Sequence, residues 1–150
     1  MNTLITPAEV FDLAFSHEEM YNASVVTDLD IAAVEERYLI PILGRTMYEA
    51  ISGGEYDELK TNFIAPMVAA WTRYMLEPLL ASRCGLCHET KATSAENTAL
   101  EERRQVLRQR ARILTRTLSD NLNAAAYPEY DPKQNPLNRC SIDGNIVQIY

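Results

Sequence analysis

Glycine, histidine and cysteine are all scarce in this sequence, with 5 Gly, 2 His and 3 Cys among 150 residues. The glycines form no phosphate-cradling loop, because Gly53-Gly54 reads as a plain turn signal. Neither histidine lies in a His-Glu-x-x-His motif, and His17 in its polar run is expected to be solvated. No nucleophile and base stand at a recognisable spacing. The sequence therefore predicts a protein that is not an enzyme and needs no cofactor.

Long apolar runs are also missing. The longest contains Ala65 to Trp71 and ends at Thr72, far short of the ~20 residues that a membrane-spanning helix requires. Glu9 and Asp12 lie where a secretory signal would need an apolar core. We therefore expect a cytosolic protein without a membrane anchor, and we expect its three cysteines, an odd number, to be reduced.

The charge of the chain is unevenly distributed. Residues 1–60 hold 12 acids and 3 bases, whereas residues 61–150 hold 9 acids and 11 bases, for a total of −7. Eleven of the 14 bases are Arg, which suits fixed, bidentate contacts better than Lys does. This balance disfavours a protein that coats nucleic acid over its whole surface. It favours a subunit whose unlike ends join copies or partners.

Helical periodicity dominates the chain as far as residue 126. Thr6-Pro7-Ala8-Glu9 is a typical helix start, and Thr27 or Asp28 can cap a second helix. Hydrophobic residues make up 47% of the chain, a value typical of a soluble globular domain. We predict an all-α bundle of about four to five helices in a domain spanning residues 1–126. Helices are expected at residues 7–15, 28 to about 40, 46–51, 62–82 and 96–126, with an exposed connection at 88–97.

The burial of individual helix faces can also be predicted from spacing. In the second helix Glu35, Glu36 and Arg37 are expected to face solvent, and Pro41 and Gly44 to end or bend the helix. Pro78 is expected to kink the central helix near residues 74–78. The stripes expected to face the core are Ile31, Val34, Tyr38 and Leu39; Ile64, Val68, Trp71, Met75 and Leu79; and Leu100, Leu107, Ala111, Leu114, Leu118 and Leu122.

The composition changes after Tyr127. Three prolines with Asn and Asp cannot continue a helix, so residues 127–150 are expected to form an extended C-terminal tail. Near its end, apolar residues alternate around Asp143-Gly144, a turn signal that predicts a short β-hairpin or an added edge strand.

A cysteine and histidine cluster offers the sharpest local motif. Cys84-Gly-Leu-Cys87-His88 fits the pattern of covalent c-type haem attachment, although such attachment takes place in an exported compartment. With the distant Cys140 the same residues form a set of four zinc ligands. Two helix-end thiols without a metal are the simpler interpretation, because a helical domain of this length needs no structural metal. We favour that interpretation and keep a metal- or haem-binding protein as an alternative.

Six arginines fall within fourteen residues of the last helix. Arg104, Arg108, Arg112 and Arg116 are four residues apart and form one slowly drifting stripe, which we call the arginine row. A solvated helix face, contact with phosphates by a DNA-binding regulator, and contact with an acidic protein surface are all compatible with it. No aromatic residues interleave with the row, so we rank protein contact above DNA contact.

The run from Ile31 to Gly44, followed by Met47-Tyr48 and Tyr56-Asp-Glu-Leu59, resembles the head-tail connector proteins of long-tailed bacteriophages and prophages. The resemblance covers residues 31 to about 82, and Tyr38, Leu43, Gly44 and Tyr48 match as fold-defining positions. It implies a structural subunit that forms a ring beneath the portal, extends the DNA channel without sequence-specific binding, and docks the next neck or tail component.

Location and contacts follow from the same resemblance. It places the protein in the virion neck after assembly in the bacterial cytoplasm, with the portal, a neck or tail completion protein and further copies of itself as partners. Its C-terminal tail would grip neighbours, with Ile146, Ile149 and Tyr150 as contacts. The long Arg-rich helix and the hairpin-like end depart from the family pattern.

Overall fold

The computed structural model describes residues 2–16, 19–84, 94–138, 140–143 and 146–149. Helices dominate it, so the predicted all-α bundle is confirmed. The helices are α1 (Pro7–Ala14), α2 (Asp28–Val34), α3 (Ile40–Leu43), α4 (Arg45–Ser52), α5 (Asp57–Leu59), α6 (Ala65–Leu76), α7 (Leu80–Arg83) and α8 (Ser94–Asp120). Short 3-10 turns span Ala23–Val25, Glu77–Leu79 and Pro136–Asn138, and the strands are β1 (Cys140–Asp143) and β2 (Ile146–Ile149).

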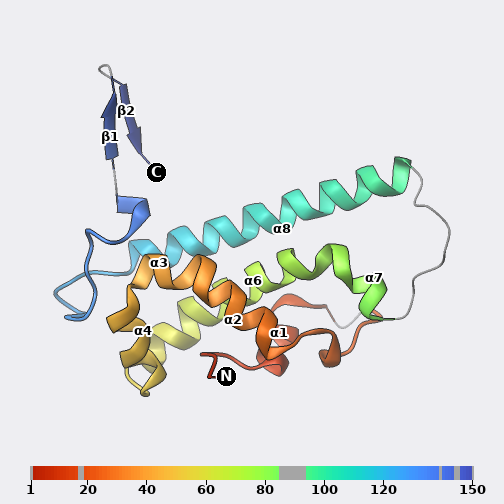
Figure 1. The fold of residues 1–150 in the computed structure, drawn as a ribbon, viewed down its shortest axis with the longest axis horizontal. Coiled ribbons are helices and arrows are strands. Elements are labelled where there is room, and N and C mark those ends of the chain that lie inside the picture. Colours follow the sequence, from red (N-terminus) through yellow and green to blue (C-terminus); the bar gives the residue numbers. More distant parts are fainter. Residues whose placement is uncertain (1, 17–18, 85–93, 139, 144–145, 150) are drawn as a thin grey trace.

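Helix α6 is the centre of the bundle. Helices α1, α2 and α8 all pack against it, and the long α8 runs alongside it in Figure 1. The side chains of Met67 and Val68 on α6, and of Ile64 immediately before it, are fully buried. Ala111 and Leu118 of α8 are equally buried, which confirms the inward stripe predicted for the last helix. The core is thus built where helical spacing places apolar residues.

Two helix starts follow the predicted capping chemistry. The Thr6 backbone N–H donates to Glu9 at 2.7 Å, and Thr6 Oγ1 accepts from the Glu9 backbone at 3.3 Å. Thr27 and Asp30 form the same reciprocal capping box at the start of α2. Each box satisfies backbone donors that a helix start leaves without an intrahelical partner.

Two prolines are accommodated inside helices by widened turns. A π-helical turn, Glu35–Leu39, joins α2 to α3 just before Pro41, and a second, Lys60–Ile64, joins α5 to α6 just before Pro66. Proline lacks an N–H and its ring clashes with the carbonyl four residues earlier, and a wider turn relieves both problems. The expected bend at Pro41 is therefore a π turn, and the helix ends only at Gly44. Pro78 lies in the Glu77–Leu79 3-10 turn, as the predicted kink requires.

Gly44 ends the helix because it has a backbone conformation that other residues rarely adopt, with φ 81° and ψ 156°. A Cβ at this position would also lie 2.9 Å from Oε1 of Gln134. We expect Gly44→Ala to lower the free energy of unfolding by about 1–3 kcal/mol in urea denaturation. Gly53→Ala is the control, since Gly53 has an ordinary φ of −75°. Equal losses in the two variants would contradict this account of Gly44.

Several expected boundaries need correction. Helix α8 begins at Ser94, inside the expected connection, and ends at Asp120 instead of residue 126. The early end has a local cause, because Asn123 accepts the Ala126 backbone N–H at 2.7 Å and so competes with continued helix. The central helix begins earlier than expected, at Asp57. Leu79 is 45% exposed because the 3-10 turn rotates it off the buried stripe.

Glu35 also contradicts the prediction, since it is buried and does not face solvent. Its carboxylate accepts the Leu4 backbone N–H at 2.8 Å and the Tyr48 hydroxyl at 2.6 Å. These bonds tie the N-terminal segment to α4 through the π-helical turn. Burial raises the pKa of Glu35 above its usual value, although both hydrogen bonds act to lower it.

The raised pKa of Glu35 predicts a pH dependence of stability. As pH rises from about 4 to 7, the unfolded chain releases this proton first, so the free energy of unfolding falls. Glu35→Gln carries no titrating proton. The free energy of unfolding of the native protein, relative to that of Glu35→Gln, should therefore decrease over this pH range. Urea denaturation at several pH values measures this difference. A difference independent of pH would count against the burial of an ionisable Glu35.

The chain after α8 is the expected proline-containing segment, and its first part folds back on the helices. Asn135 is fully buried and donates to Ser119 Oγ at 2.8 Å and to Tyr130 Oη at 2.9 Å. The Tyr56 hydroxyl donates to Glu129 at 2.6 Å, and this bond raises the pKa of Tyr56 to about 12. Residues 127–138 are thus anchored to the domain expected to end at residue 126.

The predicted hairpin is present beyond this anchor. Strands β1 and β2 pair antiparallel, with Ile142 opposite Val147, and they stand away from the helical body in Figure 1. Within the part of the chain that the structure describes, no helix is long and apolar enough to cross a membrane.

Candidate subunit interface

Helix α8 carries its arginines in two different states. Arg103 and Arg104 are held by the body of the protein: Arg103 pairs with Glu77 at 3.0 Å, and Arg104 pairs with Glu101 at 3.3 Å and lies over the Tyr74 ring. The remaining four are exposed and make no ion pair with any described residue. They are Arg108, Arg110, Arg112 and Arg116.

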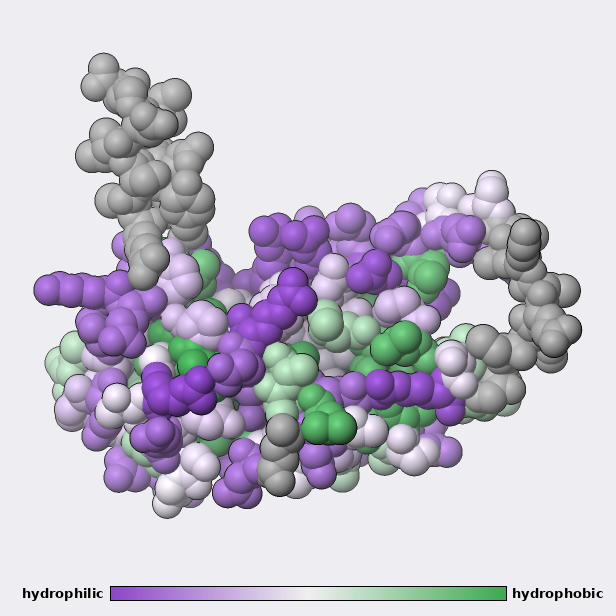
Figure 2. Space-filling model, viewed as in Figure 1, coloured by the Kyte–Doolittle hydropathy of each residue, from purple (hydrophilic) through white to green (hydrophobic). Residues whose placement is uncertain are grey.

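The arginine row is therefore divided. Its first member, Arg104, is partly buried against α6, and the three later members point progressively outward because a four-residue spacing drifts around a helix. Arg112 and Arg116 border a hollow whose lining also includes Trp71, Thr115 and Leu137. Figure 2 shows hydrophilic side chains along α8 and separate apolar patches over α6 and α2. A rigid helix thus presents unpaired cations to solvent.

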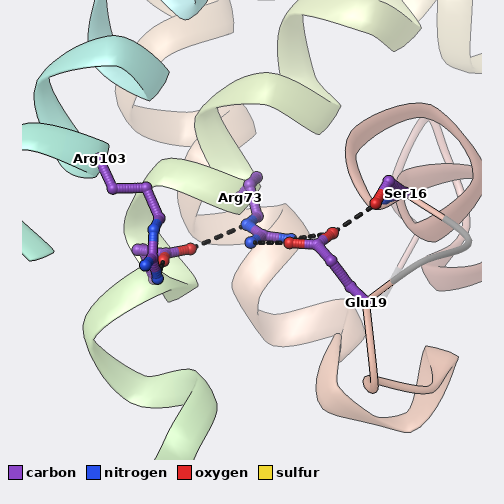
Figure 3. Close-up of polar contacts among 5 residues, drawn as sticks. Ser16, Glu19, Arg73 and Arg103 are labelled. Atoms are coloured by element: carbon purple, nitrogen blue, oxygen red, sulfur yellow. Dashed lines mark hydrogen bonds and ion pairs between the residues drawn. The ribbon is translucent and has the colours of Figure 1, made fainter. Parts of the chain in front are cut away.

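Beneath these arginines lies a buried ionic cluster that the sequence did not lead us to expect (Figure 3). Arg73 is 4% exposed and donates to Glu19 at 2.6 and 2.9 Å and to Glu77 at 2.9 Å. Its guanidinium also stacks 4.2 Å from the centre of the Phe15 ring. Hydrogen bonds from Arg73 and from the Ser16 backbone hold the pKa of Glu19 below its usual value, although burial opposes them.

This cluster connects three parts of the chain. Glu77 binds Arg73 on one oxygen and Arg103 of α8 on the other, and Glu19 belongs to the segment after α1. The cluster therefore fixes α8 and the end of α1 relative to α6. Its ion pairs hold α8 in place on α6.

The motif positions of the family resemblance all have structural roles. The Tyr38 ring stacks on Trp71 with 3.9 Å between ring centres, and Leu43 is buried in the core. Gly44 supplies the positive φ described above, and Tyr48 binds the buried Glu35. Each of the four positions thus contributes to packing or to backbone geometry.

Three acids of residues 1–60 form ion pairs with described residues, and they are Glu19, Asp30 and Glu36. Asp30 binds Arg83 at 2.6 Å, and hydrogen bonds from Arg83 and Thr27 keep the pKa of Asp30 low against the effect of burial. Glu36 binds Arg45 at 2.8 Å. Asp28 is exposed at the start of α2 and contacts no cation among the described residues. The same holds for Asp12, Glu49, Glu55, Asp57 and Glu58.

The proposed metal ligands are only partly described. Cys84 is a half-buried free thiol packed against the hydrophobic core. Cys87 and His88, like His17, lie outside the described residues, as do the side chains of Cys140, Ile146 and Ile149 and the whole of Tyr150. In the described part of the chain, no three His, Cys, Asp or Glu residues come together in a way that could hold a metal ion.

Comparisons with protein-family models, with curated proteins and with solved structures find no match for this chain.

Proposed function

We propose that this protein is a structural subunit of a bacteriophage or prophage, a ring-forming head-tail connector that joins the portal to the neck or tail. The observation that carries the proposal is the set of exposed arginines on α8 that have no ion pair with a described residue, Arg108, Arg110, Arg112 and Arg116. Charged side chains held on a rigid helix without partners in their own chain suit contact with an acidic protein surface.

The C-terminal hairpin supports the same role. Its principal contacts are between its own two strands, and an isolated two-stranded hairpin is marginally stable at best in water. A neighbouring subunit or the next neck component would stabilise it, with Ile146, Ile149 and Tyr150 as the contacting residues. In this proposal the ring lies in the virion neck after assembly in the bacterial cytoplasm, and DNA passes through it without sequence-specific binding.

The proposal predicts the effect of reversing two charges in the arginine row. Arg108→Glu/Arg112→Glu is expected to weaken self-assembly or portal binding by on the order of tenfold or more, because each attraction becomes a repulsion. Size-exclusion chromatography with light scattering, with and without the purified portal, measures the change. Arg108→Lys/Arg112→Lys keeps the charge and serves as the control. Unchanged assembly and portal binding in the reversed variant would remove these residues from the interface.

A DNA-binding regulator is the second candidate, because the same unpaired arginines could contact phosphates. It predicts retardation of duplex DNA that weakens steeply as salt concentration rises, and loss of that retardation in the charge-reversed variant. A connector whose lumen lets DNA slide predicts no stable complex with duplex DNA under the same conditions.

A further inference from the structure

A groove between α1 and α8 opens over one side of α6. It holds a cavity of about 80 Å³. Its floor consists of Pro66 and Ala70, whose short side chains leave room above α6, and its walls include Leu13 of α1 and Leu107 of α8. Arg110 stands at its rim. The groove continues along α8 toward Arg103, over the buried ionic cluster.

The groove has the properties of an unfilled contact site. Leu13 is 42% exposed although it lies beside an apolar floor. Arg110 has no carboxylate partner among the described residues, in contrast to Arg73 and Arg103 nearby. A partner segment with an apolar side chain next to a carboxylate would match both Leu13 and Arg110. The apolar side chain would pack on the groove floor, and the carboxylate would pair with Arg110. Burial of the apolar side chain would also exclude water from that ion pair, which strengthens it.

The start of α2 carries this combination. Leu29 is 67% exposed, and its neighbour Asp28 is an exposed acid without a cation partner in the described part of the chain. Ala33 follows one turn later and is also exposed, so Leu29 has a second, small apolar side chain beside it. These residues are the complement of the groove in both hydrophobicity and charge.

The chain cannot fill its own groove with these residues. The helix that begins with α2 packs its Tyr38 against Trp71 and Met75 of α6, whereas the groove floor is Pro66 and Ala70. At 3.6 residues per turn, Trp71 points about 100° or more away from both floor residues around the α6 axis. The two surfaces therefore lie on different sides of the molecule.

We propose that the groove between α1 and α8 binds the start of α2 from a neighbouring copy. Leu29 enters the groove above Pro66 and Ala70, and the Asp28 carboxylate accepts hydrogen bonds from Arg110. Because the two surfaces differ, the contact is head-to-tail and each copy can bind one neighbour on either side, which is the geometry of a ring. The inference rests on the proposed function in taking the occupant to be a second copy.

Thiol cross-linking tests this contact. In chains with Cys84, Cys87 and Cys140 changed to Ser, one population carries Leu29→Cys and another carries Leu13→Cys. A short bis-maleimide is expected to link the two populations when they are mixed and to link neither alone. Replacing the first by Glu49→Cys, on exposed α4, should abolish the product. A mixture that gives no more dimer than the separate samples would overturn the contact.

A charge exchange in the otherwise native chain gives an independent measurement. Arg110→Glu or Asp28→Arg alone should weaken self-association by on the order of tenfold, and the double variant should recover it. Glu49→Arg is the matched control. Failure of the double variant to recover association, when both single variants lose it, would overturn the pairing.

Electron microscopy separates this inference from the proposed function. Closed rings or portal complexes that are unchanged in Arg110→Glu would overturn the groove contact and leave the connector proposal standing. Open chains that cross-link through Leu13 and Leu29 but never close or bind the portal would overturn the connector proposal alone. A chain that stays monomeric at every concentration, with and without portal, would overturn both.

Discussion

Replacing Arg73 by Ala is expected to lower the free energy of unfolding by about 3–5 kcal/mol, one of the two largest effects that we predict. The substitution leaves the Glu77 side chain, which is 2% exposed, with Arg103 as its remaining ionic partner. It also removes both hydrogen bonds to Glu19 and the guanidinium that stacks on Phe15. A buried carboxylate that loses a partner is costly because it was desolvated when the chain folded.

Urea denaturation followed by circular dichroism measures this loss. Arg45→Ala is the control, because Arg45 also forms an ion pair but its side chain is 61% exposed, so the expected change is under about 1 kcal/mol. Arg73→Lys should recover only part of the stability, since a single ammonium cannot bridge Glu19 and Glu77 as a guanidinium does. A loss below about 1 kcal/mol in Arg73→Ala would mean that the cluster contributes little.

Trp71→Ala is the second large effect, with an expected loss of about 3–5 kcal/mol. Trp71 is 6% exposed, stacks on Tyr38 and packs edge-on against Tyr74. Its indole N–H donates to Thr115 Oγ1 of α8 at 2.8 Å. One side chain thus links α6 to the π-helical turn and to α8, and its removal leaves a cavity where three segments meet.

Two variants separate the parts of this contribution. Trp71→Phe keeps a ring for Tyr38 but loses the bond to Thr115, and it should cost less than the alanine variant. Leu79→Ala, at a position 45% exposed, should change stability by under about 1 kcal/mol. Because Trp71 is the single tryptophan of the chain, circular dichroism and not fluorescence must follow unfolding. Equal stability of the alanine variant and the native protein would contradict the assigned core.

The sequence predicted most of the helical layout, and its errors have identifiable causes. Capping residues and apolar spacing located the starts of α1 and α2 and the inward face of α8 correctly. Glu35 was assigned to solvent because of its charge, although it follows Ile31 by four residues and therefore lies on the inward face. Its partners, Tyr48 and the Leu4 backbone, are distant in the chain.

Only one ion pair of the buried cluster can be predicted from the sequence. Arg73 and Glu77 are four residues apart in a helix that is otherwise nearly uncharged, which is the spacing of an intrahelical pair. Glu19 and Arg103 could not be added, because their contacts depend on how α8 and the segment after α1 pack on α6. The anchoring of residues 127–138 through Asn135 could not be predicted from the sequence for the same reason.

The sequence indicated which arginines could form the candidate interface, but it did not indicate how they are arranged. The four-residue spacing identified the arginine row, but it did not show that Arg104 is held against Tyr74 while Arg110, outside the row, is unpaired at the edge of a groove. Only the packing of α1 and α8 on α6 places Arg110 beside Leu13. The groove could therefore be identified only from the structure.

The central claim, that this chain is a ring-forming connector subunit, is tested most directly by electron microscopy of the purified protein mixed with the portal of the same phage or prophage. The account predicts closed rings of this protein seated on one end of the portal, and their loss in Arg108→Glu/Arg112→Glu. Portal particles without added density, beside protein that remains monomeric at every concentration, would contradict it.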